Sequence, residues 1–589
     1  MKARFLLGAL VAMLLTIGVA SAKVDSAEEF LAIVQQRVDS GELTAEEALL
    51  LKFHYAFDRE RLPEDLQPTW LAPMKCGTPL IIELEALRGN LRGDILATIE
   101  GYLAPPEGSR AVYMSPLNNF RITYETSGQH AVPAGDANSN GVPDWVELMG
   151  EYFEYVFDFE CNQLGFQSPP IGTLYPYMSV SLESLSGIYG YTQVVSSVNG
   201  MTRIVLHNNY VGFPPNDDPD GDQLGAAKVT IAHEFKHSTQ YAGSRWSEGT
   251  WVEGDATWME EIAYPATNDY LNYLPSGSPI SSPTVTLDGN YEDCVWQHYL
   301  SENHGIPIIV DFWVWRKTHQ GQGVIDSYDQ MIINYGTSLQ SAWNEFTAWN
   351  FACGVRWLED QSYAEGFRYP TGSAQRTMTS YPSSYNSSVA RLAANFIRCL
   401  NVNSPGYAAK VTFSATAGER ITLAAVVNHS YLDYTGAYYL IPLGSDNQVE
   451  FIVPYDLDGV YSVGFVVGNA NKIGVNQSYS ISVELVPFEV DVADGLTPQL
   501  TIAGNYPNPF NPSTNIKFAL GTPGRVQLEI YDVSGRKVRT LLNATLGVGE
   551  HTVQWNGLRD DGHGMPSGTY FARLSSGDQI SSHKLLLAR

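Results

Sequence analysis

The sequence is short of basic residues. Its 589 residues include 35 Lys and Arg against 63 Asp and Glu, which gives a formal net charge of −28 at pH 7. Nucleic-acid backbones and anionic lipid surfaces are bound by clustered positive charge. The net charge therefore disfavours nucleic acid and anionic membranes as partners, and we expect no nucleic-acid partner. An acidic chain of this kind instead suits bound calcium.

Cysteine is also scarce. The chain has five cysteines, at positions 76, 161, 294, 353 and 399. A set this small and scattered excludes a scaffold built on disulfides. One or two bridges would be compatible with export, and the odd count leaves one thiol over.

Long apolar runs are missing except at the start of the chain. Lys2 and Arg4 precede an apolar stretch from Phe5 to Ala20, and Ala20-Ser21-Ala22 has the small residues of a cleavage site. This pattern is typical of a secretory signal peptide, residues 1–22. The stretch is short for a membrane span, and no other run is long enough to be one. The sequence therefore predicts an exported protein without a transmembrane segment.

The motif with the clearest chemistry is His233-Glu234-Phe235-Lys236-His237. It follows an apolar, helix-compatible run over residues 226–232, and residues four apart share one face of a helix. Both imidazoles can then reach one metal ion, while Glu234 lies beside a metal-bound water. The pattern indicates zinc with His233 and His237 as ligands and Glu234 as general base.

A second helix is expected to bring the third zinc ligand. Fifteen residues separate His237 from Glu253, enough for a loop that returns the run WVEGDATWMEE (residues 251–261) beside the first helix. HEFKH followed by this run resembles the gluzincin metallopeptidases. The resemblance implies that Glu253 is the third ligand. Because the spacer is a few residues shorter than in the thermolysin and aminopeptidase branches, Glu260 and Glu261 stay open as alternatives.

The metzincin class is excluded, because the required further histidine is missing after His237. A transition-state oxyanion needs a donor besides zinc. The segment from Asn290 to Gly305 resembles the helix that follows in many gluzincins, which often contributes a tyrosine near its start. The resemblance implies Tyr291 as this donor. The alternative is that Tyr291 only packs.

Residues 23–105 are expected to form a helical, propeptide-like region that keeps a peptidase inactive until export. Ser26 and Thr44, each followed by early acids, are typical helix N-caps. Within this region, Lys75-Cys76-Gly77-Thr78-Pro79 resembles the cysteine switch of matrix metallopeptidases, whose thiolate occupies the open position of zinc. A disulfide with Cys161 and simple burial are the alternatives for Cys76.

A calcium-loop pattern precedes the histidine motif. Oxygen ligands fall at the spacing of such a loop, with Gly141 at its sixth position. The ligand positions are Asp136, Asn138, Asn140, Val142, Asp144 and Glu147. Since an aromatic-rich helix is expected after the loop but none before it, this is half of an EF-hand, closer to a dockerin-type loop. The acidic run over residues 216–222 is a further calcium candidate.

The last third of the chain alternates in the manner of β-strands. We predict one β-sandwich over residues 388–490, and a linker followed by an Ig-like domain over residues 491–589. The closing domain contains the phrases NYPNPFNPST, IYDVSGRKVRTL, WNGLRDDG and SGTYFARL. These resemble the C-terminal sorting domain of type nine secretion substrates in Gram-negative bacteria. The resemblance implies export by that machinery, and a protein that is secreted or attached to the outer-membrane surface.

The sequence thus predicts a multidomain α+β protein. A helical propeptide and a zincin-like α+β metallopeptidase domain (residues 106–387) are followed by two β-sandwich domains. We expect a secreted zinc-dependent endopeptidase that acts on extracellular proteins or peptides. One alternative is a calcium-stabilised surface adhesin or binding protein whose metallopeptidase domain is inactive. An aminopeptidase is disfavoured, because no G-x-M-E-N-like phrase precedes the histidine motif.

Overall fold

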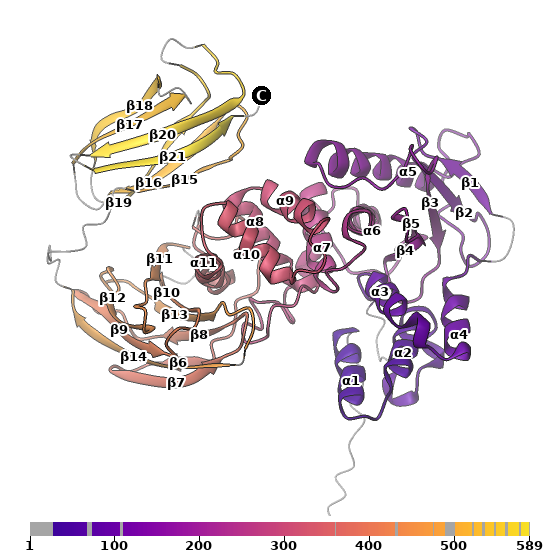
Figure 1. Cartoon of the computed structure of the whole chain (residues 1–589), viewed down its shortest axis with the longest axis horizontal. Helices are drawn as coiled ribbons and strands as arrows, with labels where there is room; N and C mark the ends of the chain where they lie inside the picture. Colours follow the sequence, from indigo (N-terminus) through magenta and orange to yellow (C-terminus); the bar gives the residue numbers. More distant parts are fainter. Residues whose placement is uncertain are drawn as a thin grey trace, which may run out of the picture. The chain divides into compact units, whose positions relative to one another are not determined.

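The structure, a computed structural model, shows the chain in two compact units (Figure 1). The first unit consists mainly of residues before Gly249, the second mainly of residues after Tyr270, and helix α7 contributes to both. The predicted signal peptide and most of the linker after residue 488 lie outside the described residues. The described residues are 27–67, 73–106, 110–359, 361–429, 434–474, 476–488, 501–520, 524–532, 536–546, 549–559, 563–576 and 579–587.

Four helices open the first unit. They are α1 (Ala27–Asp39), α2 (Ala45–Phe57), α3 (Thr78–Leu87) and α4 (Gly93–Leu103), with 3-10 turns at Arg59–Arg61, Glu64–Leu66 and Arg88–Asn90. Thr44 caps α2 as expected: its hydroxyl accepts the Glu47 N–H, and the Glu47 carboxylate accepts the Thr44 N–H. Such reciprocal capping satisfies two backbone donors that a helix start leaves open.

A mixed five-stranded sheet follows these helices. Its strands are β1 (Ala111–Met114), β2 (Phe120–Tyr124), β3 (Met178–Glu183), β4 (Gly190–Ser196) and β5 (Met201–His207). The strand order is β1-β2-β3-β5-β4, so β4 lies at one edge. Strands β2, β3 and β5 run parallel, whereas β1 and β4 pair antiparallel with their neighbours.

Helices α5 (Asp144–Phe157) and α6 (Asp222–Ser244) pack on this sheet. Aromatic rings of Phe120, Phe153 and Phe235 meet between them. Every residue of α6 from Gly225 to Tyr241 is buried. The predicted histidine helix is therefore confirmed, and it is a core helix. A core helix buries polar side chains, and these need partners.

Helix α7 (Trp251–Ala263) confirms the second predicted helix. The remaining helices of the chain are α8 (Val295–His304), α9 (Pro307–Arg316), α10 (Val324–Asn334) and α11 (Leu339–Phe351), with short turns at Asp158–Leu164, Asp269–Asn272, Tyr291–Cys294 and Gly354–Arg356. Within the second unit, the Trp313 indole donates to Asp255 at 2.7 Å. No helix in the described part of the chain combines the length and apolarity that a bilayer crossing requires.

Nine strands form a two-sheet sandwich in the second unit. Its sheets have the orders β11-β10-β13-β8-β6 and β12-β9-β14-β7. The strands are β6 (Arg376–Met378), β7 (Ser383–Val389), β8 (Ala393–Cys399), β9 (Tyr407–Ala415), β10 (Ile421–Asn428), β11 (Gly436–Ile441), β12 (Gln448–Ile452), β13 (Ser462–Asn469) and β14 (Gln477–Pro487). The first of these strands begins at residue 376, ahead of residue 388.

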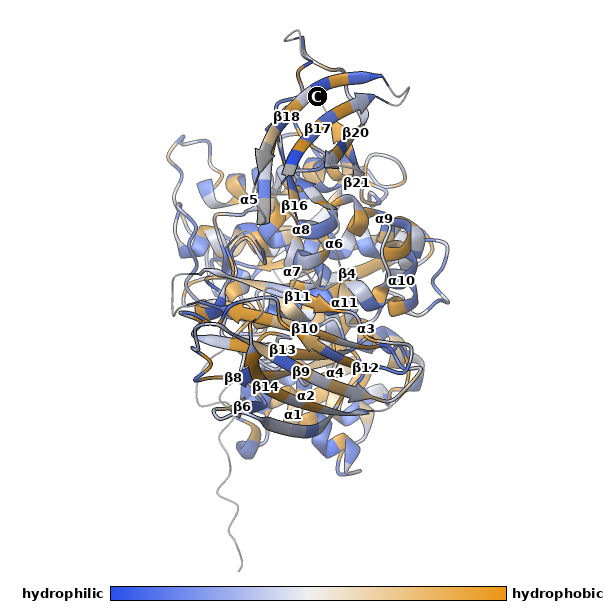
Figure 2. Cartoon of the chain, turned by 90° about the vertical axis from the view of Figure 1, so that its left-hand side faces the viewer, coloured by the Kyte–Doolittle hydropathy of each residue, from blue (hydrophilic) through white to orange (hydrophobic). Residues whose placement is uncertain are grey.

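Strand β10 is buried on both of its faces and is orange along much of its length in Figure 2. Leu423, Ala425 and Val427 belong to the core between the two sheets. Ala424 and Val426 belong to a second cluster with residues of α11 and its C-terminal end. The helix therefore covers the outer face of this sheet, and the sandwich shares its packing with the helical part of the second unit.

The C-terminal strands form a separate pair of antiparallel sheets with the orders β15-β16-β19 and β18-β17-β20-β21. They are β15 (Thr501–Tyr506), β16 (Thr514–Leu520), β17 (Gly524–Asp532), β18 (Lys537–Leu546), β19 (Gly549–Trp555), β20 (Gly568–Ser576) and β21 (Gln579–Leu587). Their inward residues form one hydrophobic cluster around Trp555 and Phe510. The chain is thus a multidomain α+β protein with sandwich-like domains.

Candidate metal centre

The two histidines of α6 lie one turn apart in the core. His233 and His237 are 1% and 0% exposed, and their ring centroids are 4.8 Å apart. Nδ1 of His233 lies 2.7 Å from a carboxylate oxygen of Glu260, and Nδ1 of His237 lies 2.8 Å from the side-chain oxygen of Gln240. Because each Nδ1 is held by an oxygen acceptor, Nε2 is the nitrogen that each ring would offer to a metal.

Glu260 contacts the Nδ1 side of the His233 ring, away from the nitrogen that would bind a metal. Its second carboxylate oxygen lies 2.8 Å from the ammonium of Lys75, which also pairs with Asp269. All three side chains are buried. Glu260 was one of the alternatives for the third ligand. In the structure, its carboxylate is taken up by the ring of His233 and by Lys75, which is the arrangement of a residue that orients a metal-binding histidine.

Glu253 precedes Glu260 on α7 by seven residues. Seven residues are two helical turns, so the two carboxylates project from the same face of the helix. The potential ligand atoms of Cys76, His233, His237 and Glu253 all lie within 4.8 Å of one another, and the four side chains are buried. The structure therefore brings the three predicted zinc ligands together and adds a cysteine to them.

Glu234 lies in the same helix turn and is 0% exposed. One carboxylate oxygen, Oε2, accepts hydrogen bonds from the hydroxyls of Thr78 at 3.0 Å and Thr192 at 2.8 Å. Its other oxygen, Oε1, has no hydrogen-bond partner within the described part of the chain. A buried carboxylate oxygen without a donor is costly. Two imidazoles, a carboxylate and a sulfur form a donor set that fits zinc.

Tyr191 precedes Thr192 in strand β4. Burial, and after it the negative charge of Glu183, raise the pKa of Tyr191 above its ordinary value. The phenol therefore stays protonated over the physiological range. Thr192 itself also lies 2.8 Å from the main-chain oxygen of Glu234, so β4 and α6 are joined directly at this residue.

No disulfide joins the five cysteines. Of the alternatives for Cys76, the bridge to Cys161 is therefore not formed. Cys76 is fully buried, and its sulfur lies 3.5 Å from Nε2 of His237. The sequence gives no spacing from which that long-range approach could be read, because 161 positions separate the two residues.

Tyr291 opens the 3-10 turn before α8 and is half-buried. Its ring packs against Tyr273 with centroids 6.2 Å apart. This contact agrees with the packing alternative and leaves the oxyanion role a prediction. Two residues later, Asp293 accepts three main-chain N–H groups from residues 288–290.

The predicted calcium loop leads directly into α5, the expected aromatic helix. Gly141 has a φ of 85°, the left-handed conformation that the sixth position of such a loop requires. Asp136 accepts the N–H groups of Asn140 and Gly141, and the Glu147 carboxylate accepts from the side-chain amides of Asn138 and Asn140. Asp144 accepts the Ala137 N–H. Val142 lies in the same turn, so the six positions are gathered around one loop.

The second calcium candidate, residues 216–222, already contains a cation. The Lys228 ammonium lies 2.8 Å from Asp218 and 2.7 Å from Asp220. The Lys228 pKa is raised, because these hydrogen bonds outweigh its burial. An ammonium group therefore already pairs with two of the four aspartates of this run, and calcium binding there stays a prediction.

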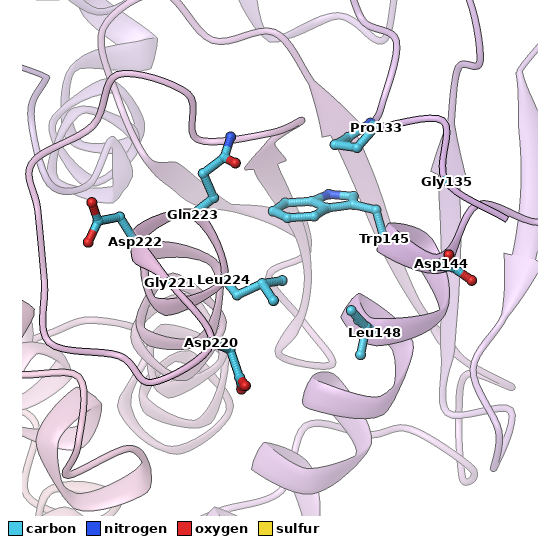
Figure 3. Close-up of a pocket in the computed structure, with 10 residues that line it drawn as sticks. All are labelled: Pro133, Gly135, Asp144, Trp145, Leu148, Asp220, Gly221, Asp222, Gln223 and Leu224. Carbon is cyan, nitrogen blue, oxygen red and sulfur yellow. The ribbon is translucent and has the colours of Figure 1, made fainter. Parts of the chain in front are cut away.

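A pocket of about 500 Å³ lies at the N-terminal end of α6 (Figure 3). Trp145 and Leu148 of α5 line it together with Gln223 and Leu224 of α6. The helix rise of about 1.5 Å per residue places Asp222 about 16 Å from His233. This hollow is therefore separate from the histidines.

Several residues around the histidines were not predicted. Gln240 follows His237 by three positions, and the i, i+3 spacing was a local signal that could have revealed it. Thr78, Thr192 and Lys75 had no such signal, because they reach α6 and α7 from distant parts of the sequence.

Comparisons with known proteins identify two segments. Residues 511–579 match the FlgD Ig-like domain family. Residues 222–436 match a family of unknown function (DUF6055). That segment runs from α6 to the start of β11. No curated protein matches the chain.

Similar solved structures cover only parts of the chain. A component of the type-IX secretion system from Porphyromonas gingivalis, PorZ, is 21% identical over 19% of this chain and 14% of its own, with a TM-score of 0.13. Latent PorU from the same organism is 17% identical over 37% of this chain and 19% of its own, with a TM-score of 0.16. β-Glucuronidase 3 from Bacteroides uniformis is 12% identical over 35% and 27%, with a TM-score of 0.15. The chain spans less than a third of each of these structures, and at these scores they carry no argument about function.

Proposed function

We propose that this protein is a secreted zinc-dependent endopeptidase that hydrolyses extracellular proteins. The observation that carries the proposal is the buried group of Cys76, His233, His237 and Glu253, with ligand atoms within 4.8 Å of one another. Glu234 lies one residue after His233 and has a buried oxygen that no described residue satisfies. Metal-assisted hydrolysis requires such a combination of metal ligands and a neighbouring general base.

Each residue has one role in the proposal. His233, His237 and Glu253 hold zinc, which when bound lowers the pKa of a water and polarises the substrate carbonyl. Glu260 and Gln240 keep the two imidazoles oriented through Nδ1. Glu234 takes a proton from the attacking water and passes it to the leaving amine.

Tyr291 donates to the developing oxyanion in this proposal. Calcium bound by the loop from Asp136 to Glu147 stiffens the entry to α5, where the loop carboxylates would otherwise repel one another. Asn138, Asn140, Val142 and Asp144 supply the remaining oxygens.

Export is the second part of the proposal. The match of residues 511–579 to the FlgD Ig-like domain supports an Ig-like module at the C-terminal end. Together with the resemblance of that module to sorting domains, it supports delivery by type nine secretion. The protein would then be secreted or held at the outer-membrane surface of a Gram-negative bacterium.

The test is casein cleavage by the parent and by Glu234→Gln, each after limited proteolysis of the N-terminal helices and with bound zinc quantified. We expect one zinc in both proteins and cleavage only by the parent, because the amide cannot accept the proton. Zinc in both without cleavage by either would favour the adhesin. Absence of zinc from both would refute the proposal.

Blocked peptides separate the two peptidase classes. An endopeptidase cuts a peptide whose N-terminus is acetylated and whose C-terminus is amidated, whereas an aminopeptidase requires the free amine. We expect cleavage of the blocked peptide at a rate comparable to that of the unblocked one.

A further inference from the structure

Residues 74–77 run beside residues 187–190, the stretch that leads into strand β4. The Met74 N–H donates to the Gly187 carbonyl at 2.7 Å, and the Tyr189 N–H donates to the Met74 carbonyl at 3.3 Å. Three residues on, the Gly77 N–H donates to the Gly190 carbonyl at 2.9 Å. These bonds make an isolated parallel bridge between Met74 and Ile188 and one further contact at Gly190, the first residue of β4. Main-chain pairing at a sheet edge is also how extended peptides bind many proteins. The segment therefore occupies a place that an extended peptide could otherwise take.

The main chain at Gly77 lies close to side chains around the start of β4. A Cβ atom at Gly77 would lie 3.0 Å from Cδ1 of Ile188 and 3.1 Å from Cβ of Tyr191. Gly190, at the start of β4, is crowded in the same way, with 2.9 Å to the Val205 carbonyl oxygen. The main chain at position 77 thus packs directly on the strand.

Three side chains of the segment reach three different parts of the candidate centre. The Cys76 sulfur lies 3.5 Å from Nε2 of His237 and accepts the Thr78 N–H at 3.1 Å. The Thr78 hydroxyl donates to the Glu234 carboxylate at 3.0 Å. Lys75 lies 2.8 Å from Glu260, which holds His233. A ligand, the base and an orienting carboxylate are therefore engaged by four consecutive residues.

We propose that Lys75–Thr78 is an inhibitory segment in which Cys76 supplies a fourth protein ligand to the metal. This inference rests on the proposed function and adds a regulatory step to it. Catalytic zinc sites keep one position for water, whereas sites with four protein ligands are closed. Cys76 fills the position of the water, Thr78 holds the base in place, and the main chain blocks the edge of β4.

Activation requires the segment to leave β4. The bond from the sulfur to the metal would then be replaced by a bond from one water molecule, and the released thiolate would take up a proton from solvent. The hydroxyl of Thr192 stays on Glu234 when Thr78 departs, so the base keeps one donor and is exposed to the incoming water. The N-terminal helices that carry the segment act as a latch in this scheme.

The first test uses the full chain with Co²⁺ in place of zinc. A cobalt–thiolate bond gives a near-ultraviolet charge-transfer band, which we expect in the parent and in the control Cys161→Ser, but not in Cys76→Ser or Cys76→Ala. Alkylation of the parent followed by peptide mass spectrometry gives a second readout that needs no variant. We expect added zinc to protect Cys76 by about tenfold or more, equivalent to about 1.4 kcal/mol. The absence of both the band and the protection would overturn the inference.

The second test measures casein cleavage by the same full-length proteins without prior proteolysis. We expect Cys76→Ser to be more active than the parent by about tenfold or more, the effect of about 1.4 kcal/mol at one ligand. Parent and Cys76→Ser that cleave equally would overturn the inference and leave the endopeptidase intact. The thiolate band could instead be present while no variant cleaves casein, even after limited proteolysis. That result would refute the endopeptidase proposal and retain Cys76 as a metal ligand.

Discussion

Glu260→Gln tests whether the carboxylate beneath His233 serves the metal. Glu260 Oε1 lies 2.7 Å from Nδ1 of His233, and both side chains are nearly inaccessible to solvent. Glutamine keeps an oxygen that can accept the N–H, so the ring keeps its orientation and loses only the negative charge. Loss of such an outer partner typically weakens metal binding by about 10–100-fold, or about 1.4–2.7 kcal/mol.

The substitution also removes the charge of one of the two carboxylates that pair with Lys75, while Asp269 keeps its charge. Removing one partner of a buried charge should lower the free energy of unfolding by about 1–3 kcal/mol. The two effects separate experimentally. Zinc affinity is measured on the folded protein by competition with a chromophoric chelator, and stability is measured by denaturant unfolding of the zinc-free protein.

Glu261→Gln is the matched control, since it removes the next carboxylate on α7, about 100° further around the helix. We expect its zinc affinity to stay within about twofold of the parent, a change of less than 0.5 kcal/mol. Unchanged affinity in Glu260→Gln would refute the orienting role. Equal losses in both variants would show that the effect is a general one of charge in α7.

Three further predictions follow from other parts of the first unit. Burial lowers the pKa of His207 to about 4, and its Nδ1 accepts the N–H groups of Asn209 and Tyr210. Since the unfolded value is about 6.5, stability should fall by about 3.4 kcal/mol in all as the pH drops from well above 6.5 to well below 4. His207→Asn should flatten that slope in urea unfolding, and an unchanged slope would refute the assignment. Lys228→Met leaves Asp218 buried without its ammonium partner, so we expect about 3–5 kcal/mol of destabilisation, against almost none for Lys317→Met on the surface. Calcium at a hundredfold excess over Kd should stabilise the parent by about 2.7 kcal/mol; Asp136→Ala should lose this gain in a thermal melt, and a gain retained in that variant would place the calcium elsewhere.

Local signals were sufficient for much of the fold. The capping pair Thr44 and Glu47, the apolar run before His233, and the alternation in strands such as β9 and β14 all act within a few residues. Each predicted element has its counterpart in the structure. The five-stranded sheet was not predicted, because β1 and β2 are short and their pairing with β3 and β5 spans long loops.

The residues of the candidate centre also fall into two groups, those set by local spacing and those brought in from distant parts of the sequence. His233, Glu234 and His237 could be predicted because one helix turn sets their spacing. The hydroxyls of Thr78 and Thr192 could not be predicted, because they meet α6 across 156 and 42 positions of sequence. Cys76 was indicated only by the resemblance of its segment to a cysteine switch. The disulfide that export permits is absent for a related reason, since a bridge also requires that two cysteines lie close together. The ion pair between Lys228 and Asp218 was not predicted either, because it forms only once α6 begins at Asp222 and places Lys228 beside the acidic run.

Both faces of β10 are buried, and this limits which parts of the chain can be inherited separately. Because α11 and the sandwich share a core through Ala424 and Val426, neither can be deleted or exchanged without exposing apolar surface to water. The match of residues 222–436 crosses from the helices into the sandwich, as expected of parts that are passed on together. The C-terminal module has its own closed core. It is therefore the cassette that recombination could attach to unrelated cargo, or remove, without unfolding what precedes it.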